Sequence, residues 1–164
     1  MDDHISIMGP PSFEDLKESI DYRLQQTGEI LGELEYEVAD CSADEFYGYI
    51  SRDTHHGSAV TVRDIIGNEY LMFHELVEVC ELKRLGLTVG EDTHSNGPKE
   101  KVYEAHLNAM EFELEYALLL EDYYWLKHRL TYHWATTLKD KSLSGELKER
   151  AQEIYDHYKM YRDY

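Results

Sequence analysis

Cysteine, proline, basic residues and long apolar runs are all scarce in this 164-residue sequence. The two cysteines, Cys41 and Cys80, form no CxxC pair and give no disulfide framework, which favours a reducing compartment. The longest apolar run, Tyr116 to Leu120, is far shorter than the roughly 20 residues that a membrane-spanning helix needs. Lysine and arginine number 16 against 34 acidic residues, a net charge of −18. This charge repels nucleic-acid backbones and anionic lipid surfaces, so we expect neither nucleic acid nor membrane as a partner.

The N-terminal residues are acidic and are followed by no apolar segment, unlike a secretory signal. We therefore expect a cytoplasmic protein. Its length suits a single helical-bundle domain over residues 1–164.

Only three prolines occur, at positions 10, 11 and 98, so two long stretches lack the residue that most reliably ends a helix. Apolar residues recur at steps of three and four, which predicts helices over residues 13–39, 61–85, 99–140 and 147–161. Local signals mark several of the ends: Ser12, Thr61 and the capping-box pattern Ser42–Glu45 at helix starts, and Gly86 after a helix end. The predicted fold is all-α, a largely antiparallel bundle of four main helices plus one short helix at residues 43–50.

Two features of this prediction concern packing. Gly28 and Gly32 lie inside the first helix, where each costs about 1 kcal/mol relative to alanine, so we expect another helix to pack closely there. The third helix, residues 99–140, contains no glycine or proline and would be roughly 60 Å long. It must either kink near residues 129–131 or project, with residues 122–164 forming a helical hairpin.

One polar stripe keeps its phase along this long helix and predicts its solvent-exposed face. The stripe consists of Glu104, Asn108, Glu111, Glu115, Asp122, Arg129, His133 and Asp140.

The sequence His74-Glu75-Leu76-Val77-Glu78 has a direct chemical interpretation. Positions i and i+4 share a helix face, so His74 and Glu78 can hold one divalent ion, with Glu75 as a candidate catalytic base. The pattern resembles the HExxH motif of zinc proteases over these five positions only, with Glu78 in place of the second histidine. The alternative is a solvated stripe, because these residues fall on the most polar side of the helix.

Three further polar residues are predicted to point inward. His106 and Glu113 lie opposite the exposed stripe of residues 99–140, and Glu69 projects among apolar residues of its helix. Unless the helical phase is wrong, two explanations remain open, because a buried charge must be paired or bound to a metal. One is mutual pairing with Arg23 as counter-ion. The other is a zinc, manganese or magnesium site built from some of Glu69, His74, Glu78, His106 and Glu113.

Other site patterns are absent or weak. The only Glu-x-x-His spacing, Glu91 to His94, falls in a glycine-bounded loop, which excludes a ferritin-like di-iron pattern. The loop containing His55 and His56 could also contribute ligands, since loops often carry sites.

Aromatic residues concentrate late in the long helix, at Tyr123–Trp125 and at Tyr132 and Trp134. Such a concentration fills a core or forms an interface. The sequence therefore leaves two functions open. The leading one is an interaction protein that forms a homo-oligomer through late residues of the third helix and the fourth helix. The alternative is a divalent-metal enzyme, most plausibly a hydrolase, with a His/Glu site between the second and third helices.

Overall fold

The computed structural model describes residues 11–51, 60–143 and 145–163, and within these ranges every regular element is helical. The all-α prediction is therefore confirmed for the described residues. The α-helices are α1 (Phe13–Glu33), α2 (Ala43–Ile50), α3 (Val62–Ile66), α4 (Glu69–Arg84), α5 (Thr93–Asn96), α6 (Lys99–Leu119), α7 (Tyr123–His133) and α8 (Gly145–Tyr158). A π-helical turn (Trp134–Leu138) follows α7, and a 3-10 helix (Lys159–Asp163) follows α8.

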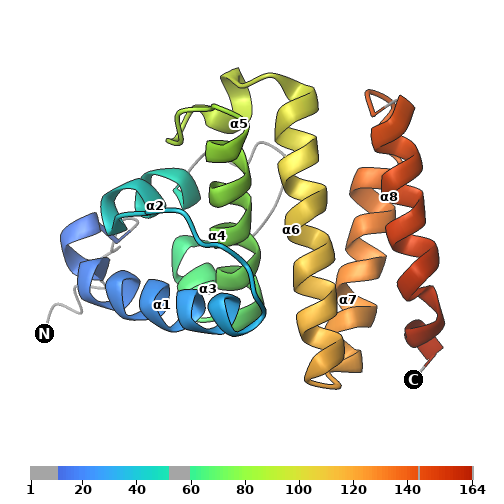
Figure 1. Ribbon diagram of the computed structural model, residues 1–164, viewed down its shortest axis with the longest axis horizontal. Helices are drawn as coiled ribbons and strands as arrows, with labels where there is room; N and C mark the ends of the chain where they lie inside the picture. Colours follow the sequence, from blue (N-terminus) through green and yellow to red (C-terminus); the bar gives the residue numbers. More distant parts are fainter. Residues whose placement is uncertain (1–10, 52–59, 144, 164) are drawn as a thin grey trace, which may run out of the picture.

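Helix α4 lies at the centre of this arrangement. Helices α1, α2 and α3 pack on one side of it, and its most extensive contact is with α6 on the other side (Figure 1). Helices α7 and α8 pack in turn against α6, and α5 lies where the chain passes from α4 to α6 (Figure 1). Because neighbours surround α4, every residue from Met72 to Cys80 is buried, polar ones included.

The predicted helix starts are correct where they depend on local capping. Ser12, Ser42 and Thr61 each accept a hydrogen bond from the backbone N–H three residues later, and the acidic side chain at that position accepts one from the backbone N–H of the cap. The helix that Thr61 begins nevertheless ends at Ile66. Asn68 caps α4 separately, so the predicted helix over residues 61–85 is two helices.

The first helix is shorter than predicted. It ends at Glu33, and Glu35 adopts the left-handed conformation with φ 62°. The N–H of Tyr36 then donates to the carbonyl of Leu31 at 2.9 Å, which closes the helix end in a Schellman arrangement.

The prediction of close packing at Gly28 and Gly32 is wrong. A Cβ added at either position would meet no heavy atom within 4 Å.

The prediction of one long third helix over residues 99–140 is also wrong. The chain leaves the helix after Leu119, passes through Glu121 with φ 55° and begins α7 at Tyr123. Asp122 accepts hydrogen bonds from the backbone N–H of Trp125 at 3.0 Å and from the hydroxyl of Tyr70 at 2.8 Å, which fixes this turn to α4. The break therefore lies near residue 121 rather than at residues 129–131.

This break changes which residues face solvent. With α7 packed beside α6, the side chains of Arg129 and His133 are buried, although the continuous stripe predicted them to be exposed. Helix α8 forms where the fourth helix was predicted, and its buried Ala151 and Ile154 belong to the same hydrophobic cluster as the core of α4 and α6. Within the described residues, no helix combines the length and the apolar character that crossing a membrane requires.

Candidate metal site

The site begins with two polar side chains on one face of α4. His74 and Glu78, one helical turn apart, are only 4% and 1% exposed, and Nε2 of His74 lies 2.9 Å from Oε2 of Glu78. The prediction of a solvated stripe at these positions is therefore wrong. The prediction fails because of tertiary packing: helix α6 covers the polar face of α4.

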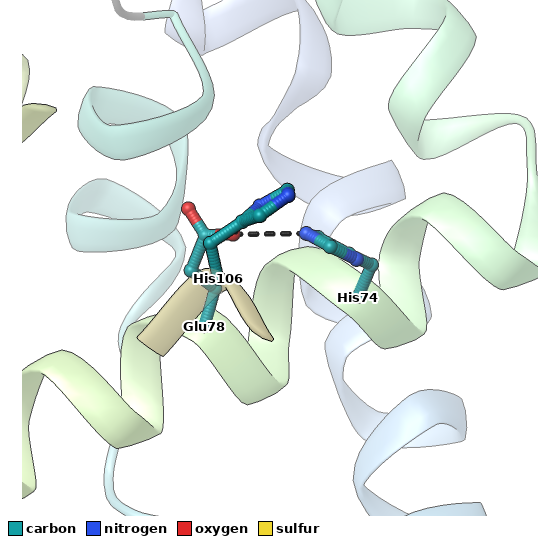
Figure 2. A group of neighbouring side chains, drawn as sticks. All are labelled: His74, Glu78 and His106. Atoms are coloured by element: carbon teal, nitrogen blue, oxygen red, sulfur yellow. Dashed lines mark hydrogen bonds and ion pairs between the residues drawn. The ribbon is translucent and has the colours of Figure 1, made fainter. Parts of the chain in front are cut away.

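Helix α6 supplies the third member of the cluster. Nδ1 of His106 lies 3.2 Å from the same carboxylate oxygen, Oε2 of Glu78. One nitrogen from each histidine and one oxygen of Glu78 all lie within 4.8 Å of one another. Figure 2 shows the three side chains converging, with His74 and Glu78 projecting from one helix toward His106. The prediction that His106 lies on the inward side of its helix is confirmed.

The second oxygen of Glu78 has different partners. Oε1 accepts a hydrogen bond from the hydroxyl of Tyr49 in α2, and Nε2 of His94 in α5 lies 2.7 Å from the same oxygen. The Tyr49 hydroxyl and His94 Nε2 are themselves 2.8 Å apart. The sequence predicts neither residue as part of the site. The spacing of His94 from Glu91 indicates only a loop pattern, and nothing in the local sequence distinguishes Tyr49.

A layer of charged and polar groups lies behind His74. Nδ1 of His74 is 2.9 Å from Oε1 of Glu113, an ion-pair distance, although the ring N–H does not point along this line well enough for a hydrogen bond. Glu113 is fully buried on α6, as predicted. Two nitrogens of Arg129 donate to its carboxylate at 2.6 and 2.9 Å, and the indole N–H of Trp125 donates at 2.7 Å. The counter-ion of this inward carboxylate is therefore Arg129 of α7.

The other predicted site residues lie elsewhere. Glu69 is exposed at the start of α4, so the prediction of an inward carboxylate there is wrong. It lines a small cavity between α1 and α4 together with Arg23, the counter-ion predicted for the core. Glu75 is buried but does not belong to the cluster of ligand atoms. His55 and His56 lie outside the described residues.

Electrostatics hold the cluster in a charged state. Burial alone would lower the pKa of His74, but the carboxylates of Glu113 and Glu78 outweigh it and raise this pKa to about 9. Burial opposes the ionised form of Glu113, yet the charges of Arg129 and His74 lower its pKa to about 2. Burial likewise opposes ionisation of Glu78, and the three histidines that contact it lower its pKa well below the usual range.

His106 differs from His74, because burial lowers its pKa more than its contact with Glu78 raises it. It is therefore a neutral imidazole near pH 7, which is the form that binds metal ions.

No protein-family model, curated protein or solved structure matches the chain.

Proposed function

We propose that this protein binds one divalent transition-metal ion, with His74 Nε2, Glu78 Oε2 and His106 Nδ1 as its ligands. The observation that carries the proposal is the convergence of one ligand atom from each of these residues, from two helices, within 4.8 Å of one another. Two imidazoles and one carboxylate are a donor set that proteins use for zinc and for non-haem iron. Magnesium is disfavoured, because it prefers oxygen ligands and retains several waters.

The groups around the ligands support this proposal over a network of ion pairs alone. Metal-binding histidines usually direct their second nitrogen toward a carboxylate or carbonyl, which orients the ring and raises its basicity. Glu113 lies in that position behind His74, and Arg129 and Trp125 hold its carboxylate in place. In the metal-free protein the His74 proton takes the place of the ion between the two carboxylates.

The proposal favours the metal-dependent alternative without identifying a reaction. A His₂Glu set is one that catalytic zinc sites use, with water as the remaining ligand, which is consistent with a hydrolase. Glu75 remains the proposed base. Its supporting observations are its position next to His74 and its burial, at 7% exposure.

A separate observation supports the interaction-protein hypothesis. Tyr124 is 83% exposed on α7, and Tyr132 and Trp134 are 40% and 45% exposed further along the same segment. Aromatic side chains of this kind are typical of protein interfaces. A homo-oligomer that uses this segment and α8 is compatible with a metal site on the other side of α6.

Metal titration of the purified full-length protein tests the main proposal. After treatment with EDTA, we expect uptake of one equivalent of zinc, measured by competition with a chromophoric chelator. Zinc at a hundredfold excess over its Kd stabilises the folded state by about 2.7 kcal/mol, which raises Tm by roughly 5 to 10 °C.

Two variants give the test its specificity. His106→Ala removes a ligand and should weaken zinc binding by about a hundredfold or more, beyond the effect usual for groups around a site. His157→Ala removes an exposed histidine of α8 and should leave zinc binding unchanged. Equal affinity in the wild type and His106→Ala would show that these residues do not hold the ion.

A further inference from the structure

A small cavity lies between α1 and α4, where α1 crosses the first turns of α4 (Figure 1). Its volume is about 190 Å³, and its lining shares no residue with the proposed metal site. Cavities that hold cofactors or drug-sized ligands are larger, at about 300 to 1,000 Å³. This cavity therefore has the size for a small metabolite such as a free amino acid.

Two opposite charges line the open side of the cavity. Arg23 of α1 is half-buried, and Glu69 of α4 is exposed. Within the part of the chain that the structure describes, the two side chains do not pair with each other, and neither forms a hydrogen bond or an ion pair with another residue. A ligand that carries both a negative and a positive group can bridge the gap between them.

A buried hydroxyl lies one helical turn after Arg23, on the same face of α1. Thr27 lines the cavity and is only 6% exposed. The hydroxyls of Thr131 and Thr136 donate to the carbonyl four residues earlier, but that of Thr27 has no hydrogen bond to any described residue. A buried polar group without a partner costs free energy, so this hydroxyl indicates a ligand group beside Arg23. The other buried residues of α1 are Leu16, Ile20 and Leu31.

The inner part of the lining is apolar. Ile30 of α1 contributes to it, together with Met72 and Phe73 of α4, which are each 1% exposed. The cavity thus combines a charged open side with a buried apolar floor. A ligand that matches both parts has two opposite charges at one end and an apolar group at the other.

We infer that this cavity binds a free α-amino acid with an apolar side chain, such as leucine or methionine. Arg23 and Thr27 donate to its carboxylate, and Glu69 accepts from its ammonium group. Guanidinium and carboxylate groups form strong, charge-assisted hydrogen bonds. The apolar side chain of the ligand packs on Met72 and Phe73, which removes its surface from water.

Isothermal titration calorimetry of the full-length protein tests this inference, with L-leucine as the probe. We expect saturable binding of one leucine per protein. Leucinamide lacks the carboxylate and N-acetylleucine lacks the ammonium group, so each should bind about tenfold or more weakly than leucine. L-Glutamate and L-lysine should also bind more weakly, because the apolar floor does not solvate a charged side chain.

Two charge variants assign the two ends of the ligand. Arg23→Gln should weaken leucine binding by about tenfold or more and leave leucinamide binding unchanged, because leucinamide has no carboxylate. Glu69→Gln should weaken leucine binding similarly and leave N-acetylleucine binding unchanged. Neither side chain is buried, so both variants are expected to fold. The matched control is Lys17→Gln, which removes an exposed cation of α1 outside the cavity and should bind leucine like the wild type.

A third variant concerns the buried hydroxyl. Thr27→Val keeps the shape of the side chain and should weaken leucine binding without lowering the Tm of the ligand-free protein, because the lost hydroxyl has no hydrogen bond there.

Failure of leucine and methionine to bind at millimolar concentration would overturn the inference and leave the proposed metal site standing, since the two sites share no residue. Equal leucine affinity in the wild type and Arg23→Gln would overturn it as well. Glutamate binding as tightly as leucine would contradict the assignment of an apolar side chain.

Discussion

Replacing Glu113 by glutamine removes one negative charge from a fully buried position without changing the size of the side chain. In the native structure this carboxylate accepts two hydrogen bonds from Arg129 and one from Trp125, and it lies 2.9 Å from His74. Glu113→Gln leaves the guanidinium of Arg129 buried with no full counter-charge, and the amide nitrogen turns a donor toward other donors.

The expected magnitude follows from burial. Removing one partner of a buried ion pair costs about 3 to 5 kcal/mol, because the remaining charge is desolvated and uncompensated. For a protein of this length, each kcal/mol lowers Tm by roughly 2 to 4 °C, so the metal-free variant should melt about 6 to 20 °C below the wild type. Differential scanning calorimetry in EDTA measures this directly.

Helix α6 also offers a matched control. Glu111 pairs with Arg150 at 3.4 Å, but the two side chains are 46% and 28% exposed, so solvent screens the pair. Glu111→Gln should therefore cost about 1 kcal/mol or less.

A second variant tests whether the unpaired charge of Arg129 causes the loss of stability. Adding Arg129→Met to Glu113→Gln removes the unpaired charge and should restore part of the lost stability. If Glu113→Gln and Glu111→Gln destabilise the protein equally, the assignment of Glu113 as a buried charge in the core of the site is wrong.

Three further predictions concern other parts of the molecule. Gly28→Ala should raise the free energy of unfolding by about 0.4 to 1 kcal/mol in urea denaturation, because the added Cβ meets no atom within 4 Å. Gly97→Ala should lower this free energy, because the added Cβ would lie 2.4 Å from the carbonyl oxygen of Thr93. His133 is buried with its pKa lowered to about 4 mainly by burial, so the unfolded chain, with an ordinary pKa near 6.5, takes up the proton first as the pH falls. Stability should therefore fall between pH 6.5 and 4 by about 3 kcal/mol, and a His133→Phe variant should lack this part of the pH dependence in chemical denaturation. Light scattering at micromolar concentration should give the mass of a dimer, and Tyr124→Ser should shift it toward the monomer; a monomeric mass for the wild type would contradict the oligomer prediction.

Features that depend on neighbours three or four residues apart could be predicted from the sequence alone. The capping residues Ser12, Ser42 and Thr61 begin helices as predicted, because the side chain of a cap bonds a backbone N–H within the same turn. Gly86 adopts the left-handed conformation after α4 for a similarly local reason. The pairing of His74 with Glu78 is of the same kind, since positions i and i+4 share a helix face.

Where a long helix ends without a helix-breaking residue depends on tertiary packing. Glu121 has no intrinsic preference for a left-handed conformation, and the contact of Tyr70 with Asp122 and the packing of α7 against α6 hold the turn in place. If residues 99–140 formed one continuous helix, Arg129 would lie on its solvent-exposed side. In the folded protein its guanidinium is the counter-ion of Glu113.

The candidate site also combines features that helix periodicity predicts with features that depend on how the helices pack. Periodicity along one helix identified His106 and Glu113 as inward-facing, since each position is defined relative to its own helix axis. Other helices supply further partners of the site: Tyr49 of α2 and His94 of α5 contact Glu78, and Arg129 of α7 contacts Glu113. Contacts between residues 16 to 29 positions apart depend on how the helices pack, and helix periodicity contains no information about that packing.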